Sequence, residues 1–272
     1  SRLQGRLVAT GVEGTIAGGA GQIGNVPLLI SEAAGQWRWQ DGVLGLDAAL
    51  FVSDEAQVDR FNPLKVPDFQ LTLADGRISA IGNLHEPESG LKVADAQIEH
   101  DLGNSTGNAL LSVDGLQFND RLQPEKLTVL TLGHIANVNG RVTGDGRIEW
   151  DANGVRSSGR FSILNTELAA AFGPVEGLET ELQFTDLLGM ATAPGQIARV
   201  RSLNPGVQAL DGVIRYQLLP DQQVRIEEGR WPFFGGELIL EPTVIDFDVE
   251  AERKLTFRLV GLDAEKFLAE VP

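Results

Sequence analysis

Residues 138–151 read VNGRVTGDGRIEWD, and every second position in this stretch is apolar or glycine. The positions between them carry only asparagine, arginine, threonine, aspartate and glutamate. Successive side chains of a β-strand point to opposite faces of a sheet. The stretch therefore predicts a long strand with one apolar face and one solvated face.

The same alternation recurs along the chain and is interrupted by short turns. A turn at residues 151–154 leads into a second alternating stretch at 155–163. Further alternating stretches occupy residues 37–39, 69–73, 214–218, 224–226 and 255–259, with turns at 75–76 and 220–221. Strands joined by tight turns favour an antiparallel meander. We predict a mostly β fold: an elongated, curved antiparallel β-sheet that forms a groove, with one or two short helices.

Two short helices are predicted, at residues 166–172 and 264–270. Asn165 and Asp263 are suitable N-cap residues for them, and Gly173 with Pro174 would end the first. The second runs into the last residues of the sequence with its apolar side chains unaccompanied. We therefore expect the chain to be a fragment of a longer protein, cut within a helix.

Composition excludes several classes of function. The 272 residues contain 38 acidic and 22 basic side chains, a net charge of −16. Such a charge repels nucleic acid and anionic headgroups, so any lipid contact would have to use apolar surface. The chain has no cysteine, which excludes thiol catalysis and thiolate metal sites. We expect no nucleic-acid partner.

No motif predicts catalysis, a metal site or a cofactor. Residues 19–24 read GAGQIG, but Pro27 follows where a dinucleotide-binding site requires a helix. The three histidines, His85, His100 and His134, lack the spacing of metal ligands. The carboxylates at 246, 248 and 250 could bind calcium, although a solvated strand end is the favoured interpretation. We expect the chain not to be an enzyme.

Glycine is frequent and often precedes arginine. A glycine–arginine–apolar triplet begins at Gly5, Gly76, Gly140, Gly146, Gly159 and Gly229. The favoured interpretation is that glycine starts or bends a strand while arginine lies on the solvated face. Glycines on the apolar face of 138–150 would leave a shallow concave surface, which we state as a hypothesis.

The densest aromatic cluster is WPFFGG, residues 231–236. It is interpreted either as a corner between strands that packs its rings in a core, or as a lip that faces lipid or a partner. The sequence alone leaves both interpretations open.

An ordered series of motifs between residues 170 and 270 carries a family resemblance. The motifs are FTDLL at 184–188, TAPGQ at 192–196, LNPG at 203–206, GVIRY at 212–216, GRWPFFGG at 229–236 and GLD at 261–263. The series resembles the YdbH family, which belongs with the AsmA-like and TamB group of bacterial envelope proteins. Residues 1–165 share only the group's style of glycine-rich amphipathic strands. We accordingly divide the chain into segments 1–165 and 166–272, continuous with each other.

The resemblance implies a function in lipid transport. The family's long β-groove would be anchored in the inner membrane by an N-terminal helix, cross the periplasm and shield phospholipid acyl chains on the way to the outer membrane. Phospholipid, and inner- and outer-membrane proteins at the ends of the full-length chain, would be the partners. The alternative is a structural or adhesive β-sandwich or β-solenoid without a lipid ligand, whose apolar strand faces would close on each other.

Strand parity gives a set of candidate groove-lining residues, each on the apolar side of an alternating stretch or in the aromatic cluster. They are Val142, Ile148, Trp150, Phe161, Ile214, Tyr216, Trp231, Phe233, Leu238, Leu240, Phe257 and Leu259.

Overall fold

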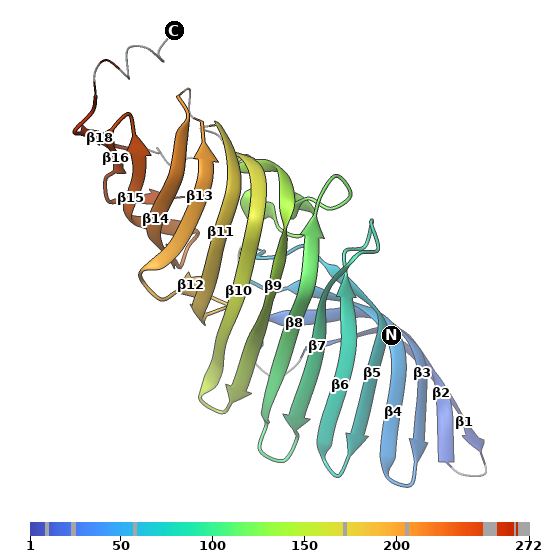
Figure 1. Ribbon diagram of the computed structural model, residues 1–272. Coiled ribbons are helices and arrows are strands. Elements are labelled where there is room, and N and C mark those ends of the chain that lie inside the picture. Colours follow the sequence, from blue (N-terminus) through green and yellow to red (C-terminus); the bar gives the residue numbers. More distant parts are fainter. Residues whose placement is uncertain are drawn as a thin grey trace. The chain divides into compact units, whose positions relative to one another are not determined.

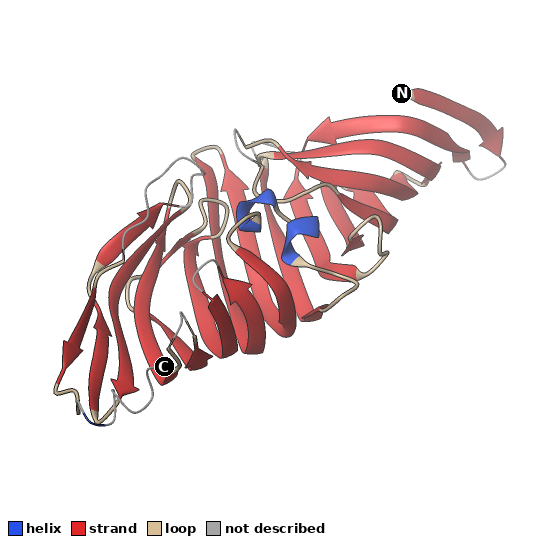
Figure 2. Cartoon of the chain, turned by 90° about the horizontal axis from the view of Figure 1, so that it is seen from above, coloured by secondary structure: helices blue, strands red, loops and turns tan. Residues whose placement is uncertain are grey.

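The computed structural model describes residues 1–8, 11–22, 26–56, 59–170, 173–204, 207–246, 255–263 and 265. In these ranges the chain is almost entirely antiparallel β-structure, which confirms the predicted fold class (Figure 1). The helical elements in these ranges are two short 3-10 helices, η1 (Pro124–Lys126) and η2 (Val129–Thr131) (Figure 2). The described chain holds no helix long and apolar enough to cross a bilayer.

The chain divides into two compact units, which are described separately. The first unit comprises Ser1–Leu116, Glu125–Val129 and Asp145–Ser157, and the second comprises Gln117–Pro124, Leu130–Gly144 and Ser158–Pro272. Strands β9 (Ile135–Asp151) and β10 (Gly154–Ala170) pair with each other and contribute to both units.

The first unit is a meander in which each strand pairs antiparallel with the next one in the chain. Figure 1 shows its strands side by side in sequence order. They are β1 (Arg2–Val8), β2 (Gly11–Gln22), β3 (Leu28–Gln40), β4 (Val43–Asp54), β5 (Leu64–Ala74), β6 (Arg77–His85), β7 (Lys92–Asp101) and β8 (Thr106–Phe118). The predicted turn at 75–76 joins β5 to β6, with positive φ at both Asp75 and Gly76.

The second unit continues the same pattern with shorter strands towards its end. Its strands after β10 are β11 (Gly173–Asp186), β12 (Ala191–Thr192), β13 (Gln196–Leu203), β14 (Ala209–Leu219), β15 (Gln223–Phe233), β16 (Gly236–Leu240), β17 (Thr243–Asp246) and β18 (Phe257–Val260). Strand β15 pairs with β16 through one half and with β17 through the other. Strand β18 pairs with β16.

The helix predicted at 166–172 is wrong, because β10 continues to Ala170 as a strand. Asn165 adopts a left-handed φ of 42°, and the pairing of β10 with β11 shifts register on either side of Thr166. Asparagine tolerates this conformation, which places an extra residue in one strand of a pair. The residue read as a helix cap therefore marks a β-bulge. Apart from Glu265, the helix predicted at 264–270 lies outside the described residues.

The solvated face carries the arginines of the glycine–arginine triplets, as predicted. All six are exposed, and several pair with carboxylates on the same or a neighbouring strand, as Arg160 does with Glu181 and Arg230 with Glu228 and Glu237. Exposed pairs of this kind contribute about 0–1 kcal/mol each. The arginines are therefore partners of the acidic face rather than a row of anion-binding groups.

Tryptophan side chains on the apolar side pack directly onto glycines. A Cβ atom added to Gly212 would lie 1.9 Å from Nε1 of Trp231, which is 1% exposed. A Cβ added to Gly107 would lie 2.4 Å from Cζ2 of Trp150. Glycine is required at these positions because the indole ring occupies the space of a side chain.

A Gly212→Ala variant should therefore be destabilised by about 1–3 kcal/mol, the usual effect of forcing extra volume into a packed site. Urea unfolding of the whole chain, followed by tryptophan fluorescence, measures this change. Gly45→Ala on β4 of the first unit is the control for the substitution itself, because nothing lies within 4 Å of an added Cβ there. Equal free energies of unfolding for the two variants would contradict the packing argument.

A buried ion pair joins Asp54, the last residue of β4, to Arg60. The Asp54 carboxylate is fully buried and accepts hydrogen bonds from Nε of Arg60 (2.7 Å), the Arg60 amide (2.6 Å) and the Ala56 amide (3.1 Å). Burial by itself raises the pKa of Asp54, but these hydrogen bonds and the Arg60 charge outweigh it and hold the pKa below its ordinary value.

Stability should therefore depend on pH through Asp54. Because the folded pKa is depressed, the contribution of Asp54 is complete above the unfolded pKa of about 4 and is lost as the pH falls towards the folded value. Asp54→Asn should cost about 3 kcal/mol at neutral pH, since it leaves Arg60 without its buried partner, and should reduce the loss of stability below pH 4. Denaturant unfolding between pH 3 and 7 measures both effects. Unchanged stability at neutral pH would contradict this role.

Candidate functional site: an apolar groove

The apolar face of the first unit carries a buried patch that crosses several strands. Its most buried members are Ala33, Leu50, Val66, Phe69 and Ala80. The register aligns one apolar residue per strand on this face, as in the row Leu46, Leu71, Ala80 and Ile98 on β4 to β7. The row is a direct consequence of strand alternation.

Two hollows lie on this face. The larger has a volume of about 420 Å³ and the smaller about 100 Å³. They adjoin, because Ile30, Leu50, Phe69 and Ile98 line both of them. We call the two hollows together the groove.

The lining of the groove is mainly aliphatic and aromatic. The larger hollow is also lined by Ile16, Gly19, Ala33, Leu46, Leu71, Ile78, Ala80 and Leu102, with Ser1, Gln22 and His100 among its polar residues. The smaller hollow is also lined by Val26, Leu28, Val52, Val66, Gly82, Leu84, Ala96, Ala109, Leu111, Ile148 and Trp150.

The sheet of the first unit must be curved around the groove. Leu28, the first residue of β3, and Val26, which precedes the strand, line the same hollow as Ala109 on β8. Five strand spacings separate β3 from β8, which is about 24 Å along a flat sheet at about 4.8 Å per spacing. Side chains so far apart in the sheet share one hollow only if its apolar face is concave.

One hydrogen bond connects the two hollows. Nε1 of Trp150, in the smaller hollow, donates to Nδ1 of His100, in the larger one, over 3.0 Å. The two ring centroids are 5.9 Å apart. Trp150 is 4% exposed, so this contact is part of the groove wall.

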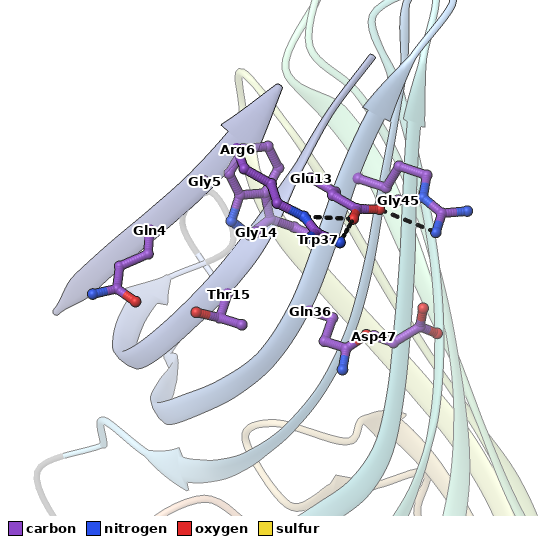
Figure 3. Close-up of a pocket in the computed structure, with 11 residues that line it drawn as sticks. Gln4, Gly5, Arg6, Glu13, Gly14, Thr15, Gln36, Trp37, Gly45 and Asp47 are labelled. Carbon is purple, nitrogen blue, oxygen red and sulfur yellow. Dashed lines mark hydrogen bonds and ion pairs between the residues drawn. The ribbon is translucent and has the colours of Figure 1, made fainter. Parts of the chain in front are cut away.

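A different hollow, about 800 Å³ in volume, is lined largely by polar residues of β1 to β4 (Figure 3). Glu13 is part of its lining and accepts hydrogen bonds from Arg6 (2.7 Å) and Arg38 (3.3 Å). The hydrogen bond from Arg6 lowers the pKa of Glu13 despite partial desolvation. Because these charges neutralise one another, this surface is a weaker candidate for ligand binding than the groove.

The apolar face of the second unit forms a packed cluster. Its buried members are Val175, Ala198, Val200, Leu203, Ala209, Tyr216, Ile226, Trp231, Phe233 and Leu240. The Tyr216 hydroxyl pairs with Oγ1 of Thr180 at 2.8 Å. Burial raises the pKa of Tyr216, and the contact with Thr180 partly offsets this. The cluster is therefore a packed core in which the Tyr216 hydroxyl has a partner, while Nε1 of Trp231 is buried without one among the described residues.

The predicted lining residues are divided between these regions. Ile148 and Trp150 line the smaller hollow of the first unit. In the second unit, Tyr216, Trp231, Phe233 and Leu240 are buried in the packed cluster, and Ile214 and Leu238 pack against it. Val142 is half-buried on β9, Phe161 contacts Phe184 edge-to-face, and Phe257 and Leu259 are exposed on β18. Lipid contact at these residues stays a prediction.

Sequence reasoning did not select most of the residues that form the groove. Leu50, Phe69 and Ile98 line both hollows, and Leu71 lines the larger one. The alternation of residues 69–73 predicted a strand there, and this signal could have placed Phe69 and Leu71 in the set. The calcium alternative stays untested, because residues 248 and 250 lie outside the described ranges.

A comparison with protein families identifies the chain. The family YdbH-like, described as intermembrane phospholipid transport protein YdbH, matches residues 2–272. The chain belongs to the YdbH-like family. No curated protein and no solved structure matches it. The family is one of lipid transport, with phospholipid as its cargo, and the match includes the N-terminal residues, where the sequence motifs were least specific.

Enlarging a side chain should affect stability differently in the hollow of the first unit and in the packed cluster of the second unit. Ala96→Leu adds methylenes to the smaller hollow and should be neutral or stabilising, at about 0.8 kcal/mol per methylene buried. Ala198→Leu adds the same group to the packed cluster and should cost about 1–3 kcal/mol. Chemical denaturation of both variants tests the contrast. A larger loss of stability for Ala96→Leu than for Ala198→Leu would contradict it.

Proposed function

We propose that the groove of the first unit shields phospholipid acyl chains from water in the periplasm, during transport between the inner and the outer membrane. The observation that carries the proposal is the pair of adjoining apolar hollows on a concave sheet face. Membership in a family of intermembrane phospholipid transport proteins supports the identity of the ligand.

The form of the groove suits an acyl chain. Its two adjoining hollows, about 420 Å³ and about 100 Å³ in volume, are lined by residues from β2 to β9. An acyl chain held in them would therefore contact several strands.

The energetics suit transport rather than permanent binding. Each methylene that leaves water for an apolar surface contributes about 0.8 kcal/mol when fully buried. An open hollow buries only part of each methylene, and apolar contact has no directional requirement. An acyl chain can therefore be held along the groove without a deep free-energy minimum at any one position.

A structural role is favoured for the second unit. Its apolar cluster is buried by its own side chains, which is what the alternative of a closed β-domain predicts. We infer that this part of the apolar face stabilises the fold, while the first unit contacts the cargo. Anchoring in the inner membrane and contacts with membrane proteins at the ends of a longer chain complete the proposal.

The absence of enzymatic activity is part of the same proposal. The family is described by transport of a lipid and not by a reaction. Apolar side chains line most of the groove, and such a surface solvates hydrocarbon without the positioned acids, bases or nucleophiles that catalysis needs.

The experiment compares two isoleucines on opposite faces. Ile98 lines both hollows, whereas Ile81 on β6 is 48% exposed and pairs with Gln97 on the solvated face. Ile98→Glu places a charge in the groove and should strongly reduce the amount of phospholipid that co-purifies with the chain, as counted by native mass spectrometry. Ile81→Glu should retain the wild-type amount.

Circular dichroism spectra of both variants check that they keep the fold. Equal phospholipid content in the two folded variants would contradict the proposal, as would a wild-type chain that takes up no phospholipid from vesicles.

A further inference from the structure

His100 gives the apolar groove one hydrogen-bond donor, and a neighbouring side chain decides which of its ring nitrogens carries the proton. An indole N–H can only donate, so the bond from Trp150 Nε1 requires a lone pair on Nδ1 of His100. A neutral imidazole with a bare Nδ1 carries its proton on Nε2. Trp150 therefore selects the tautomer of His100 and leaves Nε2–H as its donor.

Gln22, another polar side chain in this lining, is already engaged. Nε2 of Gln22 donates to the carbonyl of Val26 (3.3 Å) and to the Glu55 carboxylate. Across the described residues, no protein acceptor pairs with Nε2 of His100. Ser1, the first residue of the chain, also borders this hollow.

The surroundings of His100 strengthen the case for a ligand contact. Its partners across the sheet are Ile78 on β6 and Gly107 on β8, so neither neighbour on its own face offers an acceptor. The indole of Trp150 occupies the space above Gly107 and holds the imidazole from one side. A donor in an apolar hollow gains most from an acceptor that a ligand brings.

We propose that Nε2–H of His100 binds the acyl oxygen of the cargo, either the ester carbonyl of a lipid or the carboxylate of a free fatty acid, while the hydrocarbon lies in the groove. The residue would thereby set which end of an acyl chain lies near the β7–β8 turn. The inference rests on the proposed function, because it needs hydrocarbon in the groove, and it adds a polar specificity to it.

The test uses imidazole nitrogen NMR on the chain labelled with ¹⁵N-histidine, which contains three histidines. Without ligand, His100 should be the Nε2–H tautomer, and Trp150→Phe should remove that preference. Methyl laurate and laurate should each shift the His100 Nε2 resonance, whereas n-dodecane should leave it in place. A shift with laurate alone would assign the site to free carboxylates, and a shift with the ester would extend it to lipids.

Two substitutions separate the roles of the two ring nitrogens. His100→Asn keeps an oxygen near Nδ1 to accept from Trp150 but removes the donor at Nε2, and should weaken laurate binding about fivefold relative to dodecane. His100→Gln, which places an amide nitrogen near Nε2, should recover part of this loss.

The outcomes distinguish the inference from the proposed function. If the ratio of laurate affinity to dodecane affinity is the same for the wild type and for His100→Asn, the role of His100 is overturned. The acyl-shielding groove is then left intact. An Nδ1–H tautomer in the free protein would also overturn the role of His100. A groove that binds neither ligand would overturn both.

Discussion

The structure depends on strand alternation combined with curvature. Alternation places the apolar residues of β2 to β8 on one face of the meander, and curvature turns that face inward until side chains from β3 and β8 share a hollow. Most domains bury an apolar sheet face under a second layer. In the first unit, the sheet instead faces its own strands across a space that they do not fill.

Pairs of tryptophan and glycine allow large side chains to pack on the apolar face. Trp231 over Gly212 and Trp150 over Gly107 show large rings placed where the neighbouring strand has no side chain. Such pairs allow bulky apolar groups on a concave face, where side chains converge. On the solvated face, acidic residues and arginines pair across and along strands and keep that surface in water. Each unit therefore has one apolar face and one solvated face.

Alternation predicted the strand pattern and the exposure of the triplet arginines, because both follow from the period of two. It failed where the period is broken. Asn165 is of a residue type that is common at helix N-caps, but it lies in a β-bulge. Val66 and Phe69 are three residues apart, yet both face the groove because a register shift lies between them. The groove could not be located from sequence, since it depends on contacts between strands far apart in the chain, such as those around Val26 and Trp150.

Photo-crosslinking along β5 tests the central claim most directly. A benzophenone side chain would be introduced singly at positions 69, 70, 71 and 72 and irradiated in the presence of phospholipid vesicles. Phe69 and Leu71 line the groove, whereas Gln70 and Thr72 are exposed on the other face. The account predicts phospholipid adducts at 69 and 71 and none above background at 70 and 72. Equal labelling at all four positions, or labelling only at 70 and 72, would contradict it.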